Sequence, residues 1–359
     1  MSRKWFTSMM LVVLSAVLVL SGCSSKKEPK EALSSAAIKA LEMDSYVVEN
    51  QIKILDFSVE EAEGDAESAQ VGTVLSMLKN AEINIKQIYQ KEPMQTEATL
   101  EVKLTGDMTT TITIPLVMTT EKLYVKIPSI PFLPMPESVT GKFLELDLKE
   151  LAEQAGEEFN PDLFNPEKSQ KLSTELMGAL FAEYESAAYF SNIDPKEAAL
   201  PEGFKAKQVV QFAITNENVK EAVTILVNQA LPKMLDILAK EEYRSMLQLT
   251  PEEIEQAKKD LQEGSQEELG KVLDELKNHL QINKFTVDTA IDENNYPAYY
   301  NVQVDVAVND PDTQTNVKAA VQMTSHFTQI NEKPAFEIGI PTDTLTLEQL
   351  QEEMSQFGY

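Results

Sequence analysis

The chain has a single cysteine, Cys23, and the residues before it suit the attachment of a lipid. Leu20 stands three residues before Cys23, and the small residues Ser21 and Gly22 lie between them. This is the lipobox pattern, in which small residues let a signal peptidase reach the backbone and the thiol receives a diacylglycerol. We therefore predict cleavage between Gly22 and Cys23 and lipidation of Cys23, which has no second cysteine to form a disulfide with.

The residues before the lipobox have the layout of an export signal. Arg3 and Lys4 give a positive start, and an apolar run over 9–20 follows, shorter than the roughly 20 residues that span a bilayer. We expect 1–22 to be a signal peptide and 23–30 a flexible tether, whose lysines can lie against anionic headgroups. The predicted location is the extracytoplasmic face of the cell membrane; a plain cleavable signal followed by a chance cysteine is the alternative.

The sequence contains little that indicates catalysis. The two histidines, His279 and His326, are isolated, and His326 falls on the polar face of its strand, where we expect it to face solvent. There is no Gly-rich phosphate loop and no Gly-x-Ser-x-Gly motif. We predict a protein that is not an enzyme and has no metal or cofactor. A formal net charge of −27 disfavours nucleic acid as a partner.

The segment 128–136 is unusual because it contains four prolines among largely apolar residues. Prolines at this spacing keep a segment out of a sheet. The segment is either a loop packed over the end of the core, or the mouth of an apolar cavity or a partner-docking patch. If it is a mouth, Phe132 and Met135 are the side chains that reach the ligand, Phe132 for its area and Met135 for its adaptability.

Alternation of apolar and polar residues predicts strands, each with one buried and one wet face. Short turns between neighbouring strands make the pairing antiparallel. The predicted strands are 46–54, 96–104, 108–118, 122–127, 142–148, 205–214, 285–291, 300–309, 317–324 and 335–340.

Amphipathic spacing and capping patterns predict the helices. An early helix over 31–43 carries Leu33, Ala37 and Leu41 along one face, and Thr250 begins a capping box. The predicted helices are 31–43, 68–79, 149–155, 166–190, 218–247 with an interruption at Pro232, 250 onward, 265–280 and a short one from 346.

These elements predict an α+β fold in which helices cover the apolar face of the strands. We expect 31–359 to form one domain, a large curved antiparallel sheet of about ten or eleven strands. The sheet is an unclosed half-barrel wrapped around helices, with a helix-rich insertion at about 149–280.

The element order resembles that of the bacterial envelope carriers of the LolA type and the related LppX/LprG lipoproteins. Residues 36–54 resemble their helix-then-strand opening, 122–128 with 141–148 a hairpin of related Gram-positive lipoproteins, and 328–331 with 338–341 their closing strand. The resemblance implies a greasy cavity between sheet and helices. It also implies a membrane-anchored lipoprotein that binds or carries a lipid or other apolar molecule. The alternative is a non-enzymatic envelope interaction or structural module whose interior is filled.

The lipobox generates the first testable prediction. Replacing Cys23 with Ala removes the thiol that receives the lipid, so the protein should leave the membrane fraction or stay uncleaved. Radiolabelled fatty acid should no longer be incorporated. Equal labelling of the variant and the wild type would remove the lipoprotein assignment.

Overall fold

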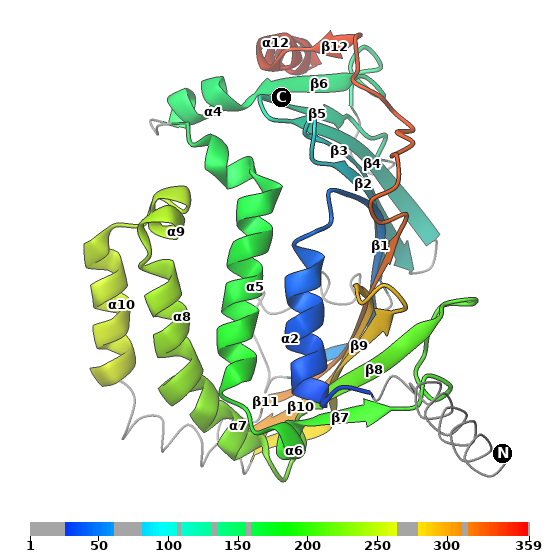
Figure 1. Ribbon diagram of the computed structural model, residues 1–359. Coiled ribbons are helices and arrows are strands. Elements are labelled where there is room, and N and C mark those ends of the chain that lie inside the picture. Colours follow the sequence, from blue (N-terminus) through cyan, green and yellow to red (C-terminus); the bar gives the residue numbers. More distant parts are fainter. Residues whose placement is uncertain are drawn as a thin grey trace, which may run out of the picture.

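The computed structural model shows one large open sheet with helices on its concave side (Figure 1). The predicted α+β fold, an unclosed curved sheet around helices with further helices in the middle of the chain, is confirmed. The structure describes residues 26–60, 81–105, 109–130, 135–155, 159–263, 279–310 and 315–357. The predicted signal peptide, Gly22, Cys23, Phe132 and the predicted helix at 68–79 lie outside these residues, as does nearly all of the helix predicted at 265–280.

The sheet has twelve strands in the order β12-β6-β5-β4-β3-β2-β1-β11-β10-β9-β8-β7. Neighbours are antiparallel except for β12 and β6, which pair in parallel over two residues. The strands are β1 (Ser45–Glu60), β2 (Glu82–Gln90), β3 (Gln95–Thr105), β4 (Thr109–Thr119), β5 (Lys122–Lys126), β6 (Phe143–Asp147), β7 (Phe190–Ile193), β8 (Ala206–Ala213), β9 (Leu280–Asp292), β10 (Pro297–Asp310), β11 (Thr315–Thr328) and β12 (Thr344–Leu345).

Two helices, α2 (Pro29–Ala40) and α5 (Pro166–Ala182), lie on the concave side of the sheet, and α8 (Leu231–Leu238) and α10 (Pro251–Glu263) lie farther out (Figure 1). The remaining helices are α4 (Leu148–Ala155), η1 (Pro161–Phe164), α6 (Ser186–Tyr189), α7 (Val219–Ile225), η2 (Leu226–Ala230), α9 (Glu241–Met246) and α12 (Leu347–Phe357). The π-helical turn η2 ends at Ala230, two residues before Pro232, which lacks an amide hydrogen.

Local capping explains where two of these helices begin. The side chain of Asn165 accepts hydrogen bonds from the amides of Glu167 and Lys168 at the start of α5, with Pro166 at its first position. At α10, the hydroxyl of Thr250 accepts from the Glu253 amide while the Glu253 carboxylate accepts from the Thr250 amide. This reciprocal pair is the capping box predicted from the sequence.

The best-packed core lies where β7, β8 and β9 meet the helices. Val210 has no exposed surface and Ile291 is 4% exposed. A group of aromatic rings packs around Phe212 at centroid distances of 5.2–6.0 Å; its members are Phe181, Tyr184, Tyr189 and Phe190. Edge-to-face and tilted contacts of this kind hold the end of α5 against the sheet.

The helices cover the concave face of the sheet unevenly. The register places Val302 opposite both Val287 and Met323, and the row continues through Ile52 and Ile83 into Val102. Away from the aromatic group, many apolar side chains on this face are only half-buried; they include Ile52, Ile54, Ile83, Ile85, Leu100, Val102, Ile112, Ile114, Val302, Val304, Val306, Val308, Val317 and Val321. This half of the concave face therefore has less cover than the half under α2 and α5.

The structure corrects several parts of the sequence prediction. The short strands β7 and β12 were not predicted, and the helix predicted over 166–190 is interrupted after Ala182. Strand β2 was not predicted, although it pairs on both sides with β1 and β3. The strand predicted at 335–340 is wrong, because these residues form an irregular segment. Their amides are satisfied by a side chain instead: the carboxylate of Glu97 accepts from Glu337, Ile338 and Gly339 at 2.8, 2.9 and 2.7 Å.

The Glu97 contact gives the second prediction. Glu97 is 2% exposed, so Glu97→Ala leaves three amides without their acceptor. The free energy of unfolding should fall by about 3 kcal/mol, in line with the cost of unsatisfied buried groups. Glu101→Ala, on the same strand and the same face, should change it by less than about 0.5 kcal/mol. Equal urea midpoints for the two variants would show that Glu97 does not hold the segment in place.

Candidate functional site

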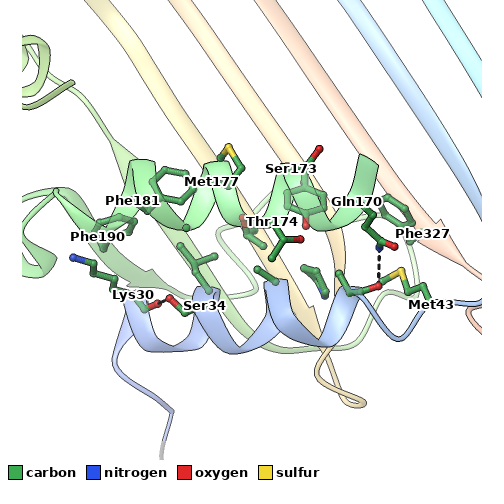
Figure 2. A pocket seen from close by; sticks show the side chains of 17 residues that line it. Lys30, Ser34, Met43, Gln170, Ser173, Thr174, Met177, Phe181, Phe190 and Phe327 are labelled. Atoms are coloured by element: carbon green, nitrogen blue, oxygen red, sulfur yellow. Dashed lines mark hydrogen bonds between the residues drawn. The ribbon is translucent and has the colours of Figure 1, made fainter. Parts of the chain in front are cut away.

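An apolar pocket of about 270 Å³ lies between α2, α5 and the concave face of the sheet. Figure 2 shows its length, with Lys30, Phe181 and Phe190 at one end and Met43 and Phe327 at the other. The α2 wall is formed at helical spacing by Lys30, Leu33, Ser34, Ala37 and Ala40. Of the apolar face predicted for this helix, Leu33 and Ala37 line the pocket, whereas Leu41 is 37% exposed.

The facing wall is a stripe of α5 that combines small and apolar residues. The stripe consists of Gln170, Ser173, Thr174, Met177, Gly178 and Phe181. The space beside Gly178 is open, because a Cβ added there would meet no atom within 4 Å. Small residues on a helix leave room between it and its neighbour, so the pocket depends on this composition.

The sheet contributes an aromatic floor. Tyr300 on β10 and Phe327 on β11 line the pocket with ring centroids 6.3 Å apart. Behind Phe327 the rings continue through Tyr46, at 5.3 Å, to Tyr89, a further 5.0 Å away. A floor of this kind supplies a large, rigid apolar surface.

Two long polar side chains along the pocket, Lys30 and Gln170, bond to the backbone. The ammonium of Lys30 donates to the carbonyls of Ala182 and Tyr184 at 2.7 and 2.8 Å, where the positive charge also suits the end of α5. The amide nitrogen of Gln170 donates to the carbonyl of Ala40 at 2.7 Å, an interaction drawn in Figure 2. With these groups occupied, the walls present mainly carbon to the pocket.

The hydroxyl of Tyr300 differs from these groups. The Tyr300 side chain is half-buried and lines the pocket, and among the described residues no group accepts a hydrogen bond from its hydroxyl. Burial raises the pKa of Tyr300 to about 12, so at neutral pH the hydroxyl keeps its proton and remains a donor. A ligand oxygen reaching this part of the pocket would find a hydrogen bond there.

Of the two residues predicted to form a mouth, the structure describes only Met135. Met135 is half-buried and does not line the apolar pocket. The neighbouring Pro136 is buried, and its carbonyl accepts from the amides of Val139 and Thr140, which fixes this end of the proline-rich segment. Phe132, Gly22 and Cys23 lie outside the described residues, so their roles stay predictions.

His326 is only partly exposed, so the expectation that it faces solvent holds in part. It packs against the rings of Phe204 and Tyr299 at 5.7 and 6.1 Å, and burial lowers its pKa. The alternation placed it correctly on the face opposite the helices, where it lines a polar groove of about 560 Å³. The segment around Phe204 folds back over this face, and strand periodicity carries no information about such a distant segment.

Other groups and comparisons add little. Within the described ranges, no group of three or more His, Cys, Asp or Glu side chains is arranged to hold a metal ion. No helix of the described part of the chain is long and apolar enough to cross a membrane. No protein-family model matches the chain, and a search of curated protein sequences finds no match either.

The Tyr300 hydroxyl gives the third prediction. Tyr300→Phe should change the free energy of unfolding by less than about 0.5 kcal/mol, because no hydrogen bond among the described residues is lost. Tyr184→Phe is the matched control, since its hydroxyl donates to the Ala222 carbonyl at 3.0 Å, and it should cost about 1 kcal/mol. Urea titration measures both. An equal loss in both variants would mean that the Tyr300 hydroxyl has a partner.

Proposed function

We propose that this protein is a membrane-anchored extracytoplasmic lipoprotein that binds or carries a lipid or another apolar molecule, with lipid on Cys23 as its anchor. The observation that carries the proposal is the apolar pocket between α2, α5 and the aromatic floor. Concave sites with mostly apolar walls and a few placed polar groups are typical of small-molecule binding. The Tyr300 hydroxyl is such a polar group.

The size and shape of the pocket favour a single chain as ligand. Its volume of about 270 Å³ is close to the lower end of small-molecule sites, about 300–1,000 Å³. It follows α2 from Lys30 to Ala40, which is about 15 Å at the rise of an α-helix. A long and narrow space of this volume suits one acyl chain, with an ester or carboxyl oxygen accepting from Tyr300.

We propose binding without catalysis. The residues that line the pocket include Ser34, Ser173 and Thr174, but no His, Asp, Glu or Cys. A hydroxyl nucleophile needs a base within hydrogen-bond reach, and the lining supplies no imidazole or carboxylate for that role.

Gly178 provides the test, which is the fourth prediction. Gly178→Phe places a ring in the open space of the pocket and should weaken uptake of a fluorescent single-chain lipid about tenfold or more, because the ring displaces several buried methylene groups. Gly178→Ala is the control: it should keep uptake and stabilise α5 by about 0.5–1 kcal/mol. Uptake is followed by fluorescence, and native mass spectrometry of the purified protein looks for a retained ligand.

Two results would contradict the proposal. One is equal uptake by Gly178→Phe and wild type, which places any lipid elsewhere. The other is the absence of uptake and of a retained ligand in the wild type. The small volume of the pocket would then favour the alternative, a non-enzymatic envelope interaction or structural module.

A further inference from the structure

A second hollow, of about 150 Å³, lies beside the start of α2 and gathers positive charge. Lys26 and Lys27, from the residues before the helix, and Lys207, from β8, line it. The other lining residues are neutral: Ala32, Ser35, Ala36, Gln208, Ile291 and Asn295. In a chain with 58 acidic and 31 basic residues, three lysines around one hollow without a carboxylate in its wall reverse the prevailing charge.

Lys27, from the N-terminal segment, is held in place by the body of the protein. The carbonyl of Lys27 accepts a hydrogen bond from Nε2 of Gln208 at 2.9 Å. Gln208 is 4% exposed and also donates to the side chain of Asn192 at 2.7 Å, so it is a rigid support. The carboxylate of Glu28 accepts from the Glu31 amide and from the hydroxyl of Ser186, which fixes the next residue as well.

The hydrogen-bond partners of Lys27 and Lys207 are neutral, so they do not compensate the positive charge of the two ammonium groups. The ammonium of Lys207 donates to the side-chain oxygen of Asn295 at 2.7 Å, and that of Lys27 donates to the hydroxyl of Ser35 at 2.8 Å. The carboxylate of Glu31 is 3.8 Å from Lys27, in a pair exposed on both sides. Such an exposed pair is weak, so the hollow keeps a positive potential that suits a phosphate group.

The position of Cys23 places this hollow near the bilayer. Only three residues separate the predicted lipid-bearing Cys23 from Lys26, a span of at most about 10 Å for extended chain. Charges interact with little screening over about 8 Å at physiological salt. Because Lys27 is fixed to β8, a lipid on Cys23 brings the lysines and the edge of the sheet to the headgroups together.

We propose that Lys26, Lys27 and Lys207 form a docking surface for the phosphate headgroups of anionic phospholipids, and that it holds the β7–β8 edge and the start of α2 against the membrane. The orientation rests on the anchor of the proposed function. It also places the Lys30 end of the apolar pocket toward the bilayer, since Lys30 lies in the first turn of α2.

The test uses the lipidated mature protein in vesicles of phosphatidylcholine, with or without phosphatidylglycerol. Since Cys23 is the only cysteine and its thiol carries the lipid, an introduced cysteine takes a fluorophore at one site. Asn294→Cys lies in the exposed turn next to Asn295, and Gln351→Cys lies on α12, far from β7 (Figure 1). A headgroup quencher should quench the label at 294 more than that at 351, and more strongly with phosphatidylglycerol.

Charge variants separate docking from general electrostatics. Replacing Lys26, Lys27 and Lys207 with Gln should reduce quenching at 294 in phosphatidylglycerol to its level in phosphatidylcholine. Replacing Lys103, Lys149 and Lys318 with Gln changes the net charge equally and should leave quenching unchanged. Equal quenching in the two lipids, or equal loss in both triple variants, would overturn the docking surface.

Failure of the anchor is visible separately. Mass spectrometry shows whether Cys23 carries diacylglycerol. If it does not, flotation of the same protein with each vesicle still tests docking. Each lysine near an anionic surface contributes about fivefold to binding. The wild type should therefore float with phosphatidylglycerol vesicles and the Lys26, Lys27 and Lys207 variant should not. Equal flotation of the two would overturn the proposal.

Discussion

The main physical constraint on this structure is that the apolar face of a twelve-stranded sheet has to be covered. At about 4.8 Å per strand the sheet is roughly 50 Å wide, whereas one helix covers about 10 Å. Helices α2 and α5 therefore bury Val210 and Ile291 at one end of the sheet but leave Val302 and Val321 half-buried. An open curved sheet with few covering helices leaves apolar hollows between the helices and the sheet, and the pocket is one of them.

Helix α2 connects the features to which function is assigned. Its small residues Ala32 and Ala36 are 3% and 1% exposed, which lets the helix approach the sheet closely. The adjacent stripe with Leu33 and Ala37 forms one wall of the apolar pocket, and its first turn borders the lysine-lined hollow. The helix begins at Pro29, within the segment predicted as a tether, so few residues separate the predicted anchor from the pocket.

Local patterns predicted much of the fold. Alternation located most strands, and the capping signals at Asn165 and Thr250 marked helix starts, because both depend on neighbours in the chain. Strand β2 was missed although Ile83 and Ile85 alternate with polar residues, a signal that was present. The false strand at 335–340 has a different cause, since its amides bond to Glu97, some 240 residues away.

The sequence by itself determined the class of fold and the helix face that forms one wall of the pocket, because both depend on the spacing of residues a few positions apart. Leu33 and Ala37 share a helix face whatever surrounds them. Only the tertiary structure decided that this face meets Ser173, Thr174 and Gly178 of α5 and leaves a hollow above Tyr300. It also decided that Lys207 joins Lys26 and Lys27. The volume of the pocket and the combined charge of the three lysines depend on distances between segments that are remote in the sequence. A linear pattern of residues does not contain those distances.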